Sequence, residues 1–178
     1  CLNPKRVLIV CPASLKLNWR REVEKWLAYK KDIGVASGRA TWPCRADIVI
    51  VNYDILKHHS DKTHGETWDL LVLDECQYVK NPKTRRAKEI IGFAGRGAIK
   101  ARKIIAASGT PIVNRPIEIY PIVNYLNRYA FPNKMRFATR YCAAVRNRWG
   151  LDMSGASNLE ELHVKLRSSL MVRRLKEE

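Results

Sequence analysis

Four short runs of consecutive apolar residues are the most regular feature of the hydrophobic pattern. They cover Val7–Cys11, Ile48–Val51, Leu70–Leu73 and Ile104–Ala107. Each run is continuous instead of alternating with polar residues, which is typical of strands buried on both faces of a parallel sheet. The pattern therefore predicts four parallel strands at the centre of a domain.

Helical periodicity occupies the sequence between the first two runs. Ser14 stands where a helix cap is expected, because hydroxyl side chains accept hydrogen bonds from the first free N–H groups of a helix. The apolar face of this helix would consist of Leu15, Trp19, Val23, Trp26 and Leu27. Strands that alternate with helices predict an α/β fold, a doubly wound parallel sheet flanked by helices.

After the fourth run the pattern changes to helices alone. Pro116 fits the first turn of one helix, and Phe137 and Tyr141 mark the apolar face of another. Asn158 followed by Glu161 resembles a capping box at the start of a last helix. We therefore expect the α/β part over residues 1–128 and an all-helical C-terminal extension over residues 129–178, with the loop 146–157 as the most flexible stretch.

Composition restricts the class of protein. The 178 residues are 46% hydrophobic and carry a net charge of +16, which indicates a packed basic domain and excludes an acidic binding module. No apolar stretch approaches the ~20 residues of a membrane span. Five cysteines without a C-x-x-C pair argue against a disulfide framework or a zinc site. We expect an intracellular protein, in the cytoplasm of a bacterium or phage host or in a nucleus.

The positive charge is concentrated in one part of the chain. Residues 81–150 contain 15 lysines and arginines and two acids, which gives that part a net charge of +13. Such an asymmetry favours a polyanion, with nucleic acid as the first candidate, because neutralising phosphates releases counterions. A solvated basic surface and an anionic membrane are the alternatives, although no segment combines a basic face with a long aromatic stripe.

Polar residues follow every one of the four apolar runs. In open α/β sheets, ligands bind beyond the carboxyl ends of the strands, so these residues outline a candidate site. They are Pro12-Ala13-Ser14, Asn52-Tyr53-Asp54, Asp74-Glu75-Cys76-Gln77 and Ser108-Gly109-Thr110-Pro111.

Asp74 and Glu75 are the strongest chemical signal in this set. Two carboxylates at the end of a buried strand are costly to desolvate unless they hold a cation or polarise a water molecule, and nucleotide hydrolysis uses both. The alternative is an Asp-Glu pair that begins a turn near a stabilising helix N-terminus. These two residues alone leave both interpretations open.

The wider set of strand-end residues resembles the motif series of SWI/SNF-type ATPases of helicase superfamily 2. The resemblance covers nearly the whole chain. It rests on Val7–Leu15 with Trp19, Val51–Tyr53, Asp74–Gln77, Lys80–Pro82, Ser108–Pro111 with Asn114 and Glu118, and Met171–Lys176. Two further segments, Trp149–Asp152 and Ser154–Leu162, are similar to the annealing-helicase, fork-remodelling branch.

This resemblance implies the first RecA-like lobe of an ATP- and magnesium-dependent translocase, with a second RecA-like lobe downstream and double-stranded or forked DNA as partner. Asp74 would hold magnesium, Glu75 would be the catalytic base, and Gln77 would couple the nucleotide state to the site. Contact with the DNA backbone would fall to Pro12, Ser14, Leu15, Lys16, Asn52 and Tyr53, coupling to Ser108, Gly109, Thr110 and Asn114, and the hinge end of the lobe to Arg173 and Arg174.

One departure from the family pattern limits the activity expected of this chain. A glycine-rich phosphate loop ending in Gly-Lys-Thr or Gly-Lys-Ser is missing, since Gly92 and Gly97 have the right separation but Ala98 stands where lysine is required. We therefore expect the chain to begin after that loop and to be inactive in isolation.

Two rival functions remain. One is a helicase of another superfamily 2 branch, such as an RNA helicase, although Gln77 and the Ser108–Pro111 series differ from the usual Asp-Glu-Ala-Asp and Ser-Ala-Thr. The other is a basic DNA-binding module without catalysis.

Overall fold

The computed structural model describes residues 4–92, 97–110, 115–148 and 150–172. The chain divides into two compact units, residues 1–109 and 110–178. The second unit begins earlier than the change of organisation expected after residue 128, because it includes the apolar helix α4 (Tyr120–Leu126). Each unit is described by itself below.

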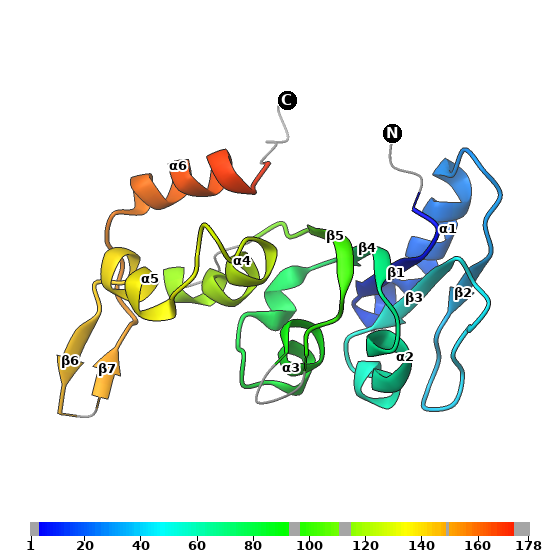
Figure 1. The fold of residues 1–178 in the computed structure, drawn as a ribbon, viewed down its shortest axis with the longest axis horizontal. Helices are drawn as coiled ribbons and strands as arrows, with labels where there is room; N and C mark the ends of the chain where they lie inside the picture. The colour runs from blue at the N-terminus through cyan, green and yellow to red at the C-terminus, as the bar shows by residue number, and fades with distance from the viewer. Residues whose placement is uncertain (1–3, 93–96, 111–114, 149, 173–178) are drawn as a thin grey trace. The chain divides into compact units, whose positions relative to one another are not determined.

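A five-stranded, fully parallel sheet forms the centre of the first unit (Figure 1). Its spatial order is β2-β3-β1-β4-β5. The strands are β1 (Val7–Cys11), β2 (Ile33–Val35), β3 (Ile48–Asn52), β4 (Trp68–Leu73) and β5 (Ala101–Ala106). The four predicted strands are confirmed, whereas the three-residue β2 was too short to produce an apolar run.

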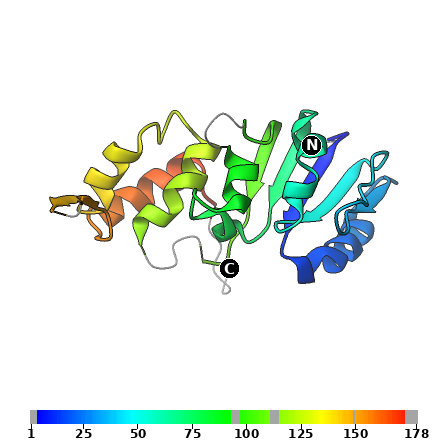
Figure 2. The same cartoon turned by 90° about the horizontal axis from the view of Figure 1, so that it is seen from below.

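The central strands β1 and β3 are buried along their whole length, as continuous apolar runs predict. Helix α1 (Lys16–Trp26) covers them, and its residues Leu15, Trp19, Val23 and Leu27 pack on this core (Figure 2). Trp26 was wrongly assigned to that face and is 73% exposed, because the helical rotation places it beside the apolar stripe.

Two further sequence predictions for this unit are wrong. Ser14 does not cap α1, since it lies in a 3₁₀ turn, η1 (Ala13–Leu15), and Leu15 is the cap residue without a side-chain hydrogen bond. Strand β5 is not buried on both faces; it is the edge of the sheet within the described residues, and Ile105 is 50% exposed.

Short helices complete the first unit. They are α2 (Ser60–His64) and α3 (Arg85–Ile91), and 3₁₀ turns η2 (Leu56–His58) and η3 (Cys76–Val79) follow β3 and β4. Thr84 caps α3, because its hydroxyl accepts a hydrogen bond from the backbone N–H of Ala87.

The described residues of the second unit form three α-helices and a β-hairpin. Helix α4 follows a 3₁₀ turn, η4 (Pro116–Ile119), and α6 (Leu159–Ser169) lies alongside α5 (Lys134–Tyr141) in both ribbon views (Figures 1 and 2). The buried side chains include Ile122, Phe137, Tyr141, Leu162 and Leu166.

The all-helical extension is wrong at one place, because β6 (Val145–Asn147) and β7 (Gly150–Asp152) pair as an antiparallel hairpin. All the described residues of its strands are exposed, so no apolar alternation marked them in the sequence. The capping box is also wrong, since Asn158 makes no side-chain cap, although α6 does begin after it. Among the described residues no helix is long and apolar enough to cross a membrane.

Candidate functional site

The parallel register places the carboxyl ends of the strands, with the polar residues that follow them, along one side of the sheet. Cys11 pairs with Asn52, and Leu73 pairs with Val10 on one side and Ala106 on the other. The residues that follow, including Ser14, Asp74 and Ser108, therefore share this side, as the sequence predicted.

Asp74 is held at three atoms. Its backbone N–H donates to the carbonyl of Val10 over 2.8 Å, which extends the ladder between β1 and β4 by one residue. The hydroxyl of Tyr53 donates to its carbonyl over 2.7 Å. The indole Nε1 of Trp19 donates to its carboxylate oxygen Oδ2 over 2.7 Å. The sequence analysis placed Trp19 in the apolar face of the helix and in the motif series, but the helical spacing does not reveal this bond.

Tyr53 and Asn52 are buried, with exposed fractions of 2% and 5%. The ring of Tyr53 stacks on Tyr78 with centroids 5.1 Å apart, and burial raises the pKa of its hydroxyl. The hydroxyl is therefore a permanent donor to Asp74 at physiological pH. The structure thus gives Tyr53 a part in positioning Asp74, and its expected contact with DNA stays a prediction.

Glu75 occupies a left-handed backbone conformation, with φ 51° and ψ 54°. This conformation costs a residue with a side chain ~1–2 kcal/mol, and such strain persists where the surroundings fix the backbone. The next residue supplies one restraint, since the N–H of Cys76 donates to the carbonyl of Ala107 over 2.9 Å. The strained turn directs the chain from β4 into η3.

A series of side-chain hydrogen bonds joins Glu75 to the end of β5. The hydroxyl of Ser108 donates to Gln77 Oε1 over 2.7 Å, and Gln77 Nε2 donates to Glu75 Oε2 over 2.6 Å. Gln77 therefore fixes one carboxylate oxygen of Glu75 and accepts a hydrogen bond from Ser108. Gln77 thus contacts both Glu75 and Ser108, which the motif pattern separates in the sequence.

Two buried thiols flank these carboxylates. Burial, reinforced by the charge of Asp74, raises the pKa of Cys11 to about 12. Burial also raises the pKa of Cys76 to about 11. Both thiols are protonated at neutral pH and supply no nucleophile to the site.

The other residues expected to meet DNA lie in several places. Ser14 is exposed in η1, whereas Lys16 donates to the carbonyl of Ala36 over 3.0 Å. Pro12 and Leu15 are half-buried, and Gly109 and Thr110 are exposed. Asn114, Arg173 and Arg174 lie outside the described residues.

A pocket of about 280 Å³ beside Tyr53 was not anticipated from the sequence. Tyr53 and Tyr78 form part of its wall, with the basic residues Lys57, Arg85 and Arg86. Arg86 is paired with Asp54 over 2.7 Å and lies over the Tyr78 ring. The pocket does not include Asp74 or Glu75, which are half-buried beyond the end of β4.

The carboxylates fit a magnesium ion shared with phosphates. Magnesium takes oxygen ligands, and in nucleotide sites it is bound by one or two carboxylates together with phosphate oxygens. Asp74 and Glu75 supply such oxygens at the strand end. The described residues contain no cluster of three or more His, Cys, Asp or Glu side chains that would hold a metal by themselves.

The sequence profile of the SNF2-related domain matches residues 3–178. The chain belongs to the SNF2-related family. It is 35% identical over 175 residues to the SWI/SNF-related matrix-associated actin-dependent regulator of chromatin subfamily A-like protein 1 of Xenopus tropicalis, covering 97% of this chain and 18% of that protein. It is 31% identical over 186 residues to the human DNA annealing helicase and endonuclease ZRANB3, covering 97% of this chain and 17% of that protein.

A solved SNF2 structure shows the same fold. The Sulfolobus solfataricus SWI2/SNF2 ATPase core in complex with double-stranded DNA superposes with a TM-score of 0.74 and 26% identity, covering 98% of this chain and 34% of that one. This SNF2-related chain thus has the RecA-like sheet that the motif resemblance implied. It spans less than a fifth of the length of the curated relatives named above.

Proposed function

We propose that this chain supplies the magnesium-binding and water-activating carboxylates, and part of the DNA track, of an ATP-driven double-stranded DNA translocase. The observation that carries the proposal is the series Ser108–Gln77–Glu75 at the same sheet edge as Asp74. Asp74, Glu75 and Gln77 all follow β4, and Ser108 follows the adjoining strand β5. This supports Glu75 as the base, Gln77 as its orienting amide and Asp74 as the metal ligand. Membership of the SNF2-related family supports this reading of the site.

Each side chain has a distinct part in the proposed reaction. Asp74 holds magnesium while Trp19 fixes the orientation of its carboxylate. Glu75 accepts the proton of the attacking water, and Gln77 keeps its other oxygen in place. Magnesium bound with ATP supplies neutralisation of the charge on the phosphates. Ser108 links Gln77 to the segment that follows β5, which is the proposed coupling path.

ATP turnover requires groups that this chain does not contain. Its sequence holds no Gly-Lys-Thr or Gly-Lys-Ser phosphate loop, and we assign that loop and the arginines of a second RecA-like lobe to the intact protein. Without them, little holds the nucleotide and nothing stabilises the charge that develops on the transferred phosphoryl group. The isolated chain is therefore inactive in this proposal.

Duplex or forked DNA is the proposed partner, bound through its phosphates. The net charge of +16 supports a polyanion. The human relative ZRANB3 is a DNA annealing helicase and endonuclease, and the similar Sulfolobus solfataricus ATPase core was solved in complex with double-stranded DNA. The annealing-helicase relative supports the fork-remodelling branch. A location inside the cell, in the nucleus or in the cytoplasm of a bacterium or phage host, is part of this proposal.

Substitution of the two carboxylates tests the catalytic assignment in the intact protein. Glu75→Gln preserves the shape but removes the base, so DNA-stimulated hydrolysis falls by at least ~100-fold while ATP and DNA still bind. Asp74→Asn also weakens magnesium-dependent nucleotide binding. Normal turnover by Glu75→Gln would falsify the assignment of the base. A binding module without catalysis would bind DNA and show no DNA-stimulated hydrolysis in the wild-type intact protein.

A further inference from the structure

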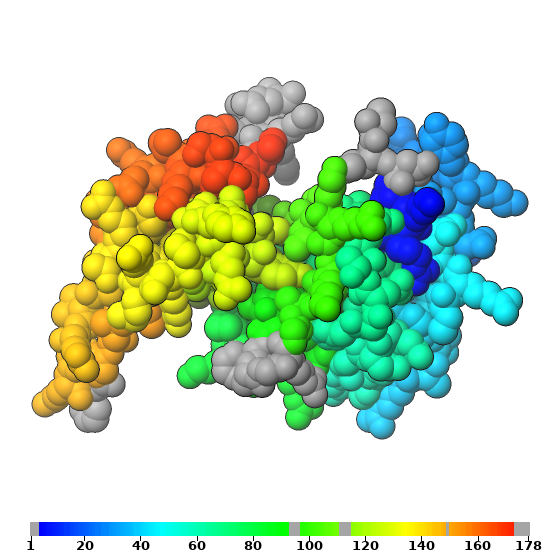
Figure 3. Space-filling model, viewed as in Figure 1, coloured from blue at the N-terminus to red at the C-terminus, as the bar shows by residue number. Residues whose placement is uncertain are grey.

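The hairpin β6–β7 buries none of the described residues of its two strands, so burial of apolar side chains does not account for its formation. Val145, Arg146 and Asn147 are exposed, and so are Gly150, Leu151 and Asp152 on the facing strand. The space-filling view shows the hairpin extending from the helices of its own unit (Figure 3). A two-stranded hairpin is marginally stable by itself in water, so its stability must come from its base.

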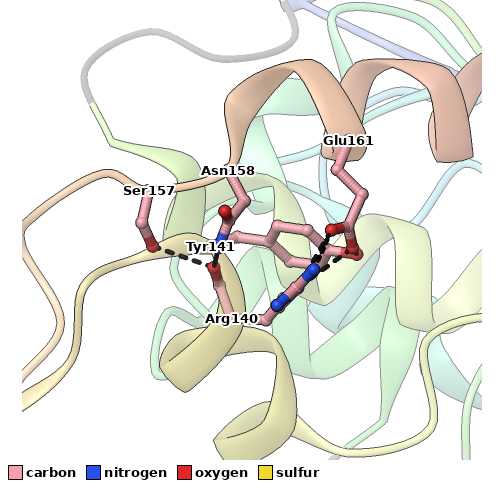
Figure 4. Close-up of polar contacts among 5 residues, drawn as sticks. All are labelled: Arg140, Tyr141, Ser157, Asn158 and Glu161. Atoms are coloured by element: carbon pink, nitrogen blue, oxygen red, sulfur yellow. Dashed lines mark hydrogen bonds and ion pairs between the residues drawn. The ribbon is translucent and has the colours of Figure 1, made fainter.

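A cluster of polar contacts joins the two segments that lead into and out of the hairpin, at its base (Figure 4). Ser157 Oγ and Asn158 Nδ2 both donate to the carbonyl of Arg140, over 2.8 and 2.7 Å. Arg140 also forms an ion pair with Glu161, whose other oxygen accepts a 2.9 Å hydrogen bond from Tyr141. These contacts join the end of α5 to the start of α6, on either side of the hairpin.

The backbone at the base has a positive φ on both arms. Ala143 has φ 45°, a left-handed conformation that costs ~1–2 kcal/mol for a residue of this kind, and Asn158 has φ 47°, which asparagine adopts more readily. Gly155 approaches the first arm so closely that a Cβ there would lie 2.9 Å from the carbonyl oxygen of Cys142. Strain of this kind is retained where surrounding contacts over-determine the backbone and is frequent at functional sites. The hairpin is therefore an exposed element whose base is fixed by these contacts.

The charge and exposure of the hairpin indicate its binding partner. Residues 145–152 contain two arginines, Arg146 and Arg148, and one acid, Asp152. Arg146 lies on β6 and Arg148 in the turn, both exposed. Because opposite residues share a face, Arg146 lies beside Leu151, and the acid lies on the other face at the base. Both arginines are exposed on the side of the hairpin away from its base, and the major groove of DNA is wide enough to admit a two-stranded β-ribbon.

We propose that the hairpin β6–β7 is a second DNA contact, outside the RecA-like sheet, in which Arg146 and Arg148 bind phosphates of duplex DNA. This inference rests on the proposed DNA-translocating function and adds a site to it. The contact is electrostatic and independent of sequence, because no base-reading side chain of the Asn or Gln kind is needed for phosphate binding.

The test compares two pairs of exposed arginines in the intact protein. Arg146→Ala/Arg148→Ala removes the proposed contacts, and Arg136→Ala/Arg167→Ala removes the same charge from α5 and α6. Binding to a labelled random-sequence duplex is measured by fluorescence anisotropy over a salt series. The hairpin pair should weaken binding by at least ~10-fold at low salt and reduce the slope of log K against log salt by about 1.8, since each phosphate contact contributes ~0.9.

The control pair should leave this slope nearly unchanged. The double variant Arg146→Lys/Arg148→Lys should keep it as well, because phosphate binding requires charge and not the guanidinium fork. Equal losses of DNA affinity in the hairpin and control variants would show that only the net charge of the protein matters, and would overturn the proposal.

The failure of the hairpin proposal can be told from failure of the underlying function. If the wild-type protein neither binds duplex DNA nor shows DNA-stimulated hydrolysis, the translocase function is wrong, and the hairpin proposal falls with it. If the wild-type protein does both and the hairpin pair keeps its affinity and slope, the hairpin proposal alone is wrong. If both proposals hold, the hairpin pair needs more DNA than the wild type to reach half of its maximal hydrolysis rate.

Discussion

The indole N–H of Trp19 donates to Asp74 Oδ2 over 2.7 Å, although the two residues lie 55 positions apart. The bond joins helix α1 to the end of β4. The turn before α1 carries Ser14, one of the residues proposed to contact DNA. A displacement of this helix would therefore also move the hydrogen-bond donor of the proposed magnesium ligand Asp74. Trp19 is thus a candidate positioning residue for Asp74.

Trp19→Phe should impair catalysis by the intact protein while leaving the fold in place. Phenylalanine keeps the packing of α1 but removes the donor, and hydrogen bonds to charged groups contribute ~1.5–3 kcal/mol. We expect DNA-stimulated kcat to fall by roughly 10-fold or more and the magnesium midpoint to rise.

Trp26→Phe is the matched control for that experiment. Trp26 lies on the same helix, is exposed, and donates its indole N–H to Glu22 over 2.9 Å, away from the site. Equal effects of the two substitutions on kcat and on the magnesium midpoint would contradict a positioning role for Trp19.

Ser108 and Gln77 should act on hydrolysis as a unit. Ser108→Ala removes the donor to Gln77, and Gln77→Ala removes the donor to Glu75. If coupling runs through this series, the double variant loses little more kcat than Gln77→Ala alone, with an interaction energy of about 1 kcal/mol. Steady-state kinetics of the wild type and three variants give this value, and additive losses would show that the two residues act independently.

Exposed and buried thiols should differ in their reactivity towards an alkylating reagent. Cys44 is exposed, whereas Cys11 and Cys76 are buried with pKa values raised to about 12 and about 11. Because the thiolate is the reacting form, iodoacetamide at about pH 7.5 should label Cys44 and spare the two buried thiols until the protein unfolds. Mass spectrometry of the labelled peptides measures this, and rapid labelling of Cys76 in the folded protein would contradict the burial.

The same thiols make stability depend on alkaline pH. Their pKa values are above the ordinary 9.0, so the folded state keeps protons that the unfolded state loses. Their contribution is therefore fully present below pH 9 and is lost as the pH rises through about 11 to 12. Cys11→Ala/Cys76→Ala should show a weaker decline of melting temperature over that alkaline range than the wild type.

Ala143→Gly should stabilise the protein, which is unusual for a change to glycine. Glycine adopts the left-handed conformation of this residue without strain, and the relief of ~1–2 kcal/mol exceeds the entropy cost of ~0.5–1 kcal/mol. Thermal unfolding should show a higher melting temperature for Ala143→Gly. The neighbouring change Ala144→Gly has no such strain to relieve and should lower it; a decrease in both would refute the left-handed geometry at the hairpin base.

The sequence by itself determined the central strands of the sheet and the chemical identity of the candidate site. Strands β1, β3 and β4 could be predicted because central strands of a parallel sheet are enclosed on both faces and must be apolar throughout. Asp74, Glu75, Gln77 and Ser108 could be recognised because ligand chemistry collects at strand ends and because the motif series is specific. The expected roles of Asn114, Arg173 and Arg174 remain predictions, since these residues lie outside the described part of the chain.

Only the tertiary structure decided which of those groups touch. The Trp19–Asp74 bond depends on how α1 crosses the sheet, which is set by packing and leaves no mark in the helical spacing. Tyr53 became a positioning residue because burial behind Tyr78 removes it from the surface. The hairpin β6–β7 gave no hydrophobic signal because its exposed strands depend on contacts of Arg140 with Ser157, Asn158 and Glu161, residues that only folding brings together.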